Sequence, residues 1–240
     1  MAHERSSGAK YWAVVPAAGV GARMGGDTPK QYLPLLGQPI IAHTLSCLCN
    51  HERISGVVVV LAAGDRWWPE TPMKYARTLM VATGGEERRD SVLNGLDTLS
   101  RRASARDWVL VHDAVRPCLR HEDIDRLMDE LGKDEVGGLL ATPVKDTMKR
   151  SSANNRVRET ISRESLWHAQ TPQMFRLGAL REALRLTIDE DRDVTDEAQA
   201  MELAGARPRL VPGHDDNIKI TRREDLELAE LLLGRRGHGR

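Results

Sequence analysis

Two cations in a glycine-rich segment are the residues of this 240-residue chain best suited to chemistry on phosphates. Arg23 and Lys30 lie seven positions apart, and small residues dominate the stretch from Pro16 to Met24. Glycine lets the backbone approach a polyphosphate that a Cβ atom would hold away. The apolar run Tyr11 to Val15, which precedes the segment, is typical of a buried parallel strand. The sequence therefore predicts a strand followed by a phosphate-binding loop.

This loop differs from two familiar phosphate-binding motifs. Gly19-Val20-Gly21 begins like a dinucleotide-binding fingerprint, but Met24 stands where the third glycine belongs. The Gly-Lys-Ser/Thr ending of a P-loop is also missing at the required spacing. A glycine-rich turn that merely reverses the chain is the alternative. Such a turn has no need of two cations or of the Pro-Lys-Gln-Tyr sequence that follows.

The composition excludes several classes of protein. Lys plus Arg and Asp plus Glu number 35 each, and a general nucleic-acid binder would carry a basic surplus. No apolar run approaches the ~20 residues that span a bilayer, and residues 1–10 lack the apolar core of a signal peptide. Cys47, Cys49 and Cys118 are an odd number, which argues against a disulfide framework. We expect a cytoplasmic protein that contacts neither membrane nor nucleic acid.

Apolar runs alternate with helical patterns along the chain. The runs are 56–62, 78–82, 108–111 and 137–144, and the helical stretches are 39–49, 88–99, 121–131, 177–188, 195–204 and 222–233. This alternation predicts an α/β fold, Rossmann-like, with a mostly parallel sheet and helices on both faces. We expect residues 1–240 to form a single domain, with ligands at the carboxyl ends of the strands.

The alternation is interrupted at about residues 145–162. The polar cluster Ser151 to Asn155 is typical of a turn, and the segments on either side of it predict a projecting β-hairpin. A surface loop without regular structure is the alternative.

Several blocks of the chain, in the same order, resemble the cytidylyltransferases of the methylerythritol phosphate route to isoprenoids. These blocks are Pro16–Lys30, Pro39–Leu45, Val111–Pro117, Pro143–Lys149, Trp167–Gln173, Thr195–Ala198 and Asp216–Thr221. The resemblance implies transfer of a cytidylyl group from CTP to a polyol phosphate. It also implies a homodimer in which the two hairpin arms are exchanged. The acceptor would be 2-C-methyl-D-erythritol 4-phosphate or, as the alternative, ribitol 5-phosphate; a non-catalytic nucleotide sensor is a third reading.

The resemblance also implies roles for individual residues. Arg23 and Lys30 would stabilise the transition state, and Arg163 and Lys219 would position the acceptor. CTP would contact Pro16, Ala17, Ala18, Gly19, Gly21, Gly85, Glu86, Ser91 and Ala114. The acceptor would contact Asp113, Arg116, Thr147, Thr171 and Thr195. The family often has Asp or Ser where this chain has Glu86. Thr147 and Arg163, in or beside the arm, would then serve the partner's site.

Two further expectations concern metal and acid–base chemistry. Nucleotidyl transfer normally uses Mg²⁺, which we expect the CTP phosphates to hold, and we name no protein ligand for it. His43, His112 and His168 invite a general-base role, but a phosphate nucleophile is already ionised. We therefore interpret them as packing or hydrogen-bonding residues.

Overall fold

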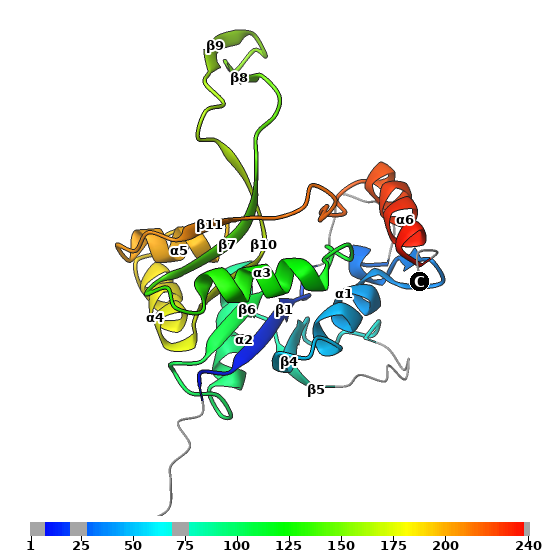
Figure 1. Cartoon of the computed structure of the whole chain (residues 1–240), viewed down its shortest axis with the longest axis vertical. Coiled ribbons are helices and arrows are strands. Elements are labelled where there is room, and N and C mark those ends of the chain that lie inside the picture. Colours follow the sequence, from blue (N-terminus) through cyan, green and yellow to red (C-terminus); the bar gives the residue numbers. More distant parts are fainter. Residues whose placement is uncertain (1–7, 20–27, 69–76, 238–240) are drawn as a thin grey trace, which may run out of the picture.

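A seven-stranded sheet with helices on both faces forms the body of the protein in the computed structural model, which describes residues 8–19, 28–68 and 77–237 (Figure 1). In spatial order the strands are β11 (Arg209–Pro212), β7 (Gly137–Pro143), β10 (Trp167–Arg176), β6 (Trp108–Val111), β1 (Tyr11–Pro16), β4 (Ile54–Leu61) and β5 (Thr78–Thr83). The helices are α1 (Ile40–Cys49), α2 (Arg88–Leu99), α3 (His121–Leu131), α4 (Leu177–Asp189), α5 (Glu197–Leu203) and α6 (Arg223–Gly237). Short elements η2 (Lys30–Tyr32), β2 (Pro34–Leu35) and β3 (Gln38–Pro39) connect β1 to α1.

The sheet is mostly parallel, as the sequence pattern predicts. β1 pairs in parallel with both β4 and β6, β4 with β5, and β7 with β11. β10 lies between β6 and β7 and is antiparallel to both. A parallel sheet places the carboxyl ends of its strands at one edge, where ligands bind.

The sequence pattern predicts neither β10 nor β11. Buried polar residues interrupt the apolar pattern of β10, namely Gln170, Thr171 and Gln173. In β11 only Val211 of the four residues is buried. Both strands are specified by the neighbours they pair with rather than by a local apolar run.

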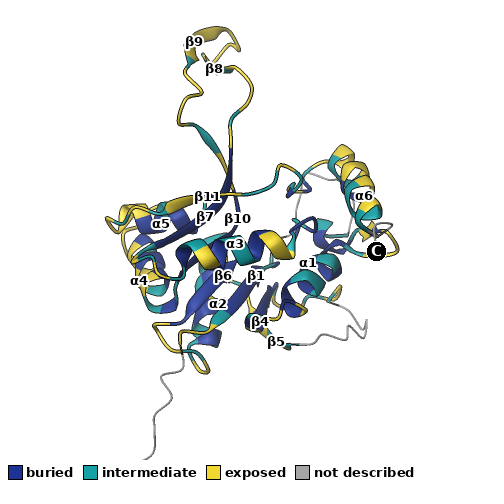
Figure 2. Ribbon diagram, in the orientation of Figure 1, coloured by how far each residue is buried: buried dark blue, intermediate teal, exposed yellow. Residues whose placement is uncertain are grey.

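The two faces of the sheet bury separate apolar layers, because successive side chains of a strand point to opposite sides. Ala13 and Val15 of β1 pack in one layer, and Val14 packs in the other. The first layer includes side chains from α1 and α3, and the second includes side chains from α2, α4 and α5. The central strands are accordingly buried on both sides (Figure 2).

A two-stranded hairpin extends away from this body between β7 and β10 (Figure 1). Strands β8 (Met148–Ser151) and β9 (Val157–Ile161) pair in the antiparallel direction. Most of their residues are exposed, including the apolar Val157 (Figure 2). A use of this hairpin in dimerisation stays a prediction.

The described part of the chain contains no helix that is both long and apolar enough to cross a bilayer.

The contact of α2 with the sheet gives a test of the fold. A Cβ atom on Gly95 would lie 2.7 Å from Val14 Cγ1 and 2.9 Å from Val60 Cγ2. We expect Gly95→Ala to lower the free energy of unfolding by about 1–3 kcal/mol through overpacking, although alanine favours helix by about 1 kcal/mol. Gly234→Ala in α6, where a Cβ atom would meet nothing within 4 Å, is the matched control and should not destabilise. Urea denaturation measures both, and equal effects of the two variants would contradict the packing.

Candidate active site

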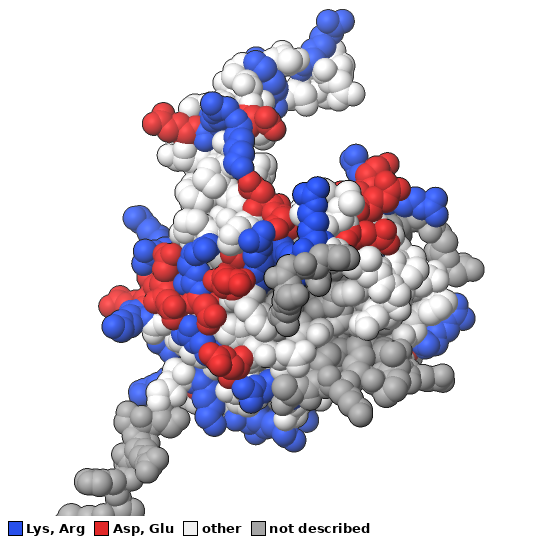
Figure 3. All heavy atoms as spheres, turned by 45° about the vertical axis from the view of Figure 1, so that its right-hand side comes forward, with Lys and Arg blue, Asp and Glu red and all other residues white. Residues whose placement is uncertain are grey.

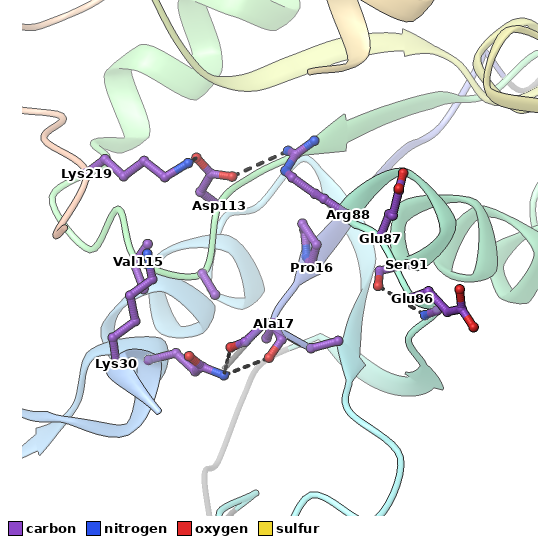
Figure 4. Close-up of a pocket in the computed structure, with 15 residues that line it drawn as sticks. Pro16, Ala17, Lys30, Glu86, Glu87, Arg88, Ser91, Asp113, Val115 and Lys219 are labelled. Carbon is purple, nitrogen blue, oxygen red and sulfur yellow. Dashed lines mark hydrogen bonds and ion pairs between the residues drawn. The ribbon is translucent and has the colours of Figure 1, made fainter. Parts of the chain in front are cut away.

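A pocket of about 220 Å³ opens beside the carboxyl ends of β1 and β6 and the first turn of α2 (Figure 4). It brings together residues that lie just over 200 positions apart in the chain, from Pro16 to Lys219. All the residues predicted to bind CTP that the structure describes line it: Pro16, Ala17, Ala18, Gly19, Gly85, Glu86, Ser91 and Ala114. Lys30, Asp113 and Lys219 line it as well. Gly21 and Arg23 lie outside the described residues.

One side of the pocket depends on the close approach of two loops. A Cβ atom on Gly84 would lie 2.4 Å from Ala18 Cβ and 2.9 Å from Ser91 Oγ, so only glycine fits there. The neighbouring Gly85 N–H donates to Ser91 Oγ at 3.1 Å. The loop after β1 and the turn before α2 therefore form one continuous wall of small residues and backbone groups.

Gln31 fixes the loop after β1. Its side-chain amide Nε2 donates to the carbonyl oxygens of Ala17 at 2.7 Å and Gly19 at 3.1 Å, and the side chain is buried. Lys30 is the adjacent residue in η2, and its side chain lines the pocket and extends toward Val115 (Figure 4). The hydrogen bonds of Gln31 thus tie η2, which contains Lys30, to the loop after β1.

Asp113 lies at the end of β6 and is surrounded by cations. Its Oδ1 lies 3.3 Å from Arg88 Nη2, and its Oδ2 lies 3.0 Å from Lys219 Nζ and 3.4 Å from Arg116 Nε. Arg88 and Lys219 approach the carboxylate from opposite sides (Figure 4). Burial by itself would raise the pKa of Asp113, but the charges of Arg88, Lys219 and Arg116 hold it well below its usual range. Asp113 is therefore an anion at neutral pH.

Thr171 and His112 lie behind Asp113 and hold its backbone. The N–H of Asp113 donates to Thr171 Oγ1 at 3.1 Å, and Thr171 Oγ1 lies 2.9 Å from His112 Nδ1. Burial lowers the pKa of His112 to about 4, so the ring is neutral at pH 7. One tautomer satisfies every group: Nε2–H donates to the Arg116 carbonyl oxygen, and Nδ1 accepts from the Thr171 hydroxyl.

The remaining predicted residues lie away from this pocket in the single chain. Thr147 and Arg163 are exposed on either side of the hairpin, and Arg163 donates to the Lys145 carbonyl oxygen. Thr195, just before α5, donates its hydroxyl to Gln199 Oε1 at 3.0 Å. Thr171 is buried behind the pocket wall. Contacts of these residues with an acceptor stay predictions.

Four residues that line the pocket were not among the predicted contacts: Gln31, Glu87, Arg88 and Val115. Arg88 and Gln31 have clear structural roles there. A cation in the first turn of a helix is disfavoured by the helix dipole, so the position of Arg88 at the start of α2 is itself a signal. A glutamine next to Lys30 carries no such signal, because its role depends on carbonyl groups more than ten residues away.

The described residues do not form a metal site made by protein alone. No cluster of three or more His, Cys, Asp or Glu side chains suited to a metal ion occurs among them. Both oxygens of Asp113 already face cations. A metal ion held by the CTP phosphates stays a prediction.

Charges on the surface are mixed rather than segregated. Acidic and basic side chains lie intermixed around the base of the hairpin and over α6 (Figure 3). On the face drawn there, the described residues present no continuous basic stripe of the kind that tracks a nucleic-acid backbone.

His112 makes stability depend on pH. The unfolded chain has the ordinary histidine pKa of 6.5 and the folded chain about 4, so the stabilisation is complete above pH 6.5 and is lost as pH falls toward 4. We expect His112→Asn to remove up to about 3 kcal/mol of this pH dependence. Urea denaturation at intervals between pH 7.5 and 4 measures it. An unchanged slope in the variant would contradict a buried neutral ring.

A family model and named relatives match the sequence over nearly its whole length. A family model described as 2-C-methyl-D-erythritol 4-phosphate cytidylyltransferase matches residues 11–235. A protein of that name from Pseudomonas putida (strain W619) is 54% identical over 228 residues, which cover 94% of this chain and 97% of that protein. Another from Hahella chejuensis is 50% identical over 226 residues and covers 94% of each chain.

Solved structures agree with the sequence match. A crystal structure named 4-diphosphocytidyl-2C-methyl-D-erythritol synthase superposes with a TM-score of 0.82 at 35% identity, covering 94% of this chain and 99% of that one. The 2-C-methyl-D-erythritol 4-phosphate cytidylyltransferase of Francisella tularensis superposes with a TM-score of 0.80 at 34% identity, covering 93% and 100%. The chain therefore belongs to the 2-C-methyl-D-erythritol 4-phosphate cytidylyltransferase family.

Proposed function

We propose that this chain transfers the cytidylyl group of CTP to 2-C-methyl-D-erythritol 4-phosphate, giving 4-diphosphocytidyl-2-C-methyl-D-erythritol and pyrophosphate. Family membership makes the chain a nucleotidyltransferase. The observation that carries the proposal is one pocket with two unlike sides. Small residues and backbone groups line one side, and a carboxylate with its three cations lies on the other.

CTP would occupy the side made by the loop after β1 and the turn before α2. The base and ribose would contact the backbone at Gly85 and the Ser91 hydroxyl, because these groups offer donors and acceptors at close range. The triphosphate would then extend along Ala17 to Gly19 toward Lys30. Arg23, which the family resemblance assigns to the same phosphates, would join Lys30 there.

The acceptor would occupy the side around Asp113. Its phosphate needs a cation, and Lys219 is 41% exposed at its side chain and faces the pocket. The Asp113 carboxylate is an acceptor of the kind that binds polyol hydroxyl groups. Arg116 adds positive charge next to it.

The chemical step requires positioning and charge stabilisation more than proton transfer. A phosphate oxygen of the acceptor forms a bond to the α-phosphorus of CTP. The bond from that phosphorus to the bridging oxygen of the β-phosphate breaks, and pyrophosphate leaves. Lys30 lines the pocket and would lie beside the triphosphate, where negative charge develops. Mg²⁺ bound to the CTP phosphates would share that charge.

Exchange of hairpin arms between two copies would complete the site. Thr147 and Arg163 are exposed and lie outside the pocket of their own chain. The arm also exposes apolar Val157, which a partner subunit would cover. We propose a homodimer in which each arm supplies Thr147 and Arg163 to the neighbouring pocket. A cytoplasmic location is proposed on the composition of the chain.

Pyrophosphate release from CTP tests the function directly. Equal concentrations of 2-C-methyl-D-erythritol 4-phosphate and ribitol 5-phosphate should compete in one assay, with the products separated by mass. We expect the methylerythritol product to dominate. Dominance of the ribitol product would overturn the proposed acceptor, and no product from either would overturn the enzymatic proposal.

The same assay tests Lys30. We expect Lys30→Ala to lower kcat by about 10²–10³, because it removes one preorganised charge from the transition state. The exposed Lys133, after α3, gives a matched control: Lys133→Ala should keep wild-type kcat. Thermal unfolding should show both variants folded. Wild-type turnover in Lys30→Ala would refute its role.

Mixing two inactive variants tests the exchanged arms. If each site takes Lys30 from one subunit and Arg163 from the other, heterodimers of Lys30→Ala and Arg163→Ala contain one intact site. Random reassortment then restores roughly a quarter of wild-type activity. Mixtures that stay as inactive as the separate variants, despite subunit exchange shown by mass spectrometry, would mean that each site uses a single chain.

A further inference from the structure

Arg88 occupies a position that the helix dipole opposes. It is the first residue of α2, where the exposed N–H groups carry partial positive charge. A cation at that position is favourable only if nearby anions compensate for the dipole. Two carboxylates compensate for it here: Asp113, which follows β6, and Glu197, the first residue of α5.

Glu197 fixes the guanidinium of Arg88 from outside the pocket. Arg88 Nη1 lies 2.5 Å from Glu197 Oε1, and Nη2 lies 3.2 Å from Oε2, which is a two-pronged contact. Glu197 is the first residue of α5, its side chain is 1% exposed, and it does not line the pocket. The contact therefore fixes the direction in which Arg88 points, and the carboxylate that does so lies outside the pocket lining.

Arg88 in turn holds one oxygen of Asp113. Its Nη2 lies 3.3 Å from Oδ1, whereas Lys219 and Arg116 face Oδ2. An acceptor phosphate would compete with Asp113 for Lys219, because a dianion attracts an exposed ammonium more strongly than one carboxylate does. Arg88 would then keep the carboxylate in place while Oδ2 becomes available to a polyol hydroxyl.

We infer that Arg88 is a positioning residue that holds Asp113 ready for the acceptor, and that Glu197 acts on the acceptor through Arg88. This inference rests on the proposed function. It assigns the acceptor specificity of the enzyme to a bridge of three residues: Glu197 on α5, Arg88 on α2 and Asp113 after β6. The bridge lies between the wall that would bind the nucleotide and the cations that would bind the acceptor.

Steady-state kinetics with each substrate varied in turn test the bridge. We expect Arg88→Gln and Glu197→Gln each to raise KM for 2-C-methyl-D-erythritol 4-phosphate about tenfold or more, the loss typical of a charge-assisted contact. KM for CTP should change less than about twofold. Arg88→Lys, which keeps the charge, should fall between wild type and Arg88→Gln. The double variant should be no worse than Arg88→Gln alone, because Glu197 acts only through Arg88.

Arg89→Gln is the matched control. Arg89 lies in the same turn of α2 and pairs with Glu87 at 2.9 Å, but it does not line the pocket. We expect it to leave both KM values unchanged even if it lowers the melting temperature. If Glu197→Gln does not fold, Glu197→Asp, which shortens the reach of the carboxylate, replaces it and should raise KM for the acceptor in the same way.

A readout without turnover separates this inference from the proposed function. Isothermal titration calorimetry of the acceptor into protein saturated with α,β-methylene CTP gives acceptor affinity directly. Weaker binding in Arg88→Gln, with Arg89→Gln like wild type, supports the bridge. Unchanged acceptor affinity and KM in Arg88→Gln and Glu197→Gln would overturn it, as would a rise in KM for CTP alone. Wild-type protein that binds both substrates without forming product would instead overturn the proposed function.

Discussion

A buried carboxylate that must stay charged is the constraint around which this site is built. Asp113 sits at the end of a central strand, where desolvation opposes ionisation, and three cations from separate segments hold it as an anion. The three segments are the start of α2, the loop after β6 and the stretch before α6. Only the folded sheet brings them together, so the electrostatics of the pocket depend on the strand order. Removing any one cation leaves a mostly buried carboxylate with less compensation for its lost hydration.

The antiparallel strand β10 supplies a polar group that lies behind Asp113. β10 runs antiparallel in the middle of otherwise parallel strands and carries Thr171 to the back of Asp113. His112, neutral because it is buried, completes that contact by joining Thr171 to the carbonyl oxygen of Arg116. Buried polar residues that would weaken an ordinary strand thus position the end of β6. His112 packs and forms hydrogen bonds. The sequence predicts this role, because an ionised phosphate nucleophile needs no general base.

The sequence predicts the layered α/β fold because its central strands are continuous apolar runs with helical patterns between them. It also predicts which small residues line the pocket, through the glycine-rich segments and the family resemblance. The sequence does not predict the roles of Arg88 and Gln31 or the presence of β10. Their roles depend on partners such as Glu197, or the carbonyl oxygen of Gly19, and local patterns do not encode such partners. Of these three, only Arg88 is marked in the sequence, because it is a cation in the first turn of a helix, where the helix dipole favours an anion. The roles proposed for Thr147 and Arg163 would require a second copy of the chain, which no local pattern of the sequence can specify.

The central claim is that one pocket holds the nucleotide on its small-residue wall and the acceptor phosphate at the opposite cations, with Asp113 between them. A crystal structure with α,β-methylene CTP, Mg²⁺ and 2-C-methyl-D-erythritol 4-phosphate tests this most directly. The account predicts the cytosine against Gly85 and Ser91, the triphosphate beside Lys30 and the acceptor phosphate on Lys219. Arg88 should remain on Asp113. A nucleotide phosphate bound to Lys219, or an acceptor bound away from Asp113, would contradict it.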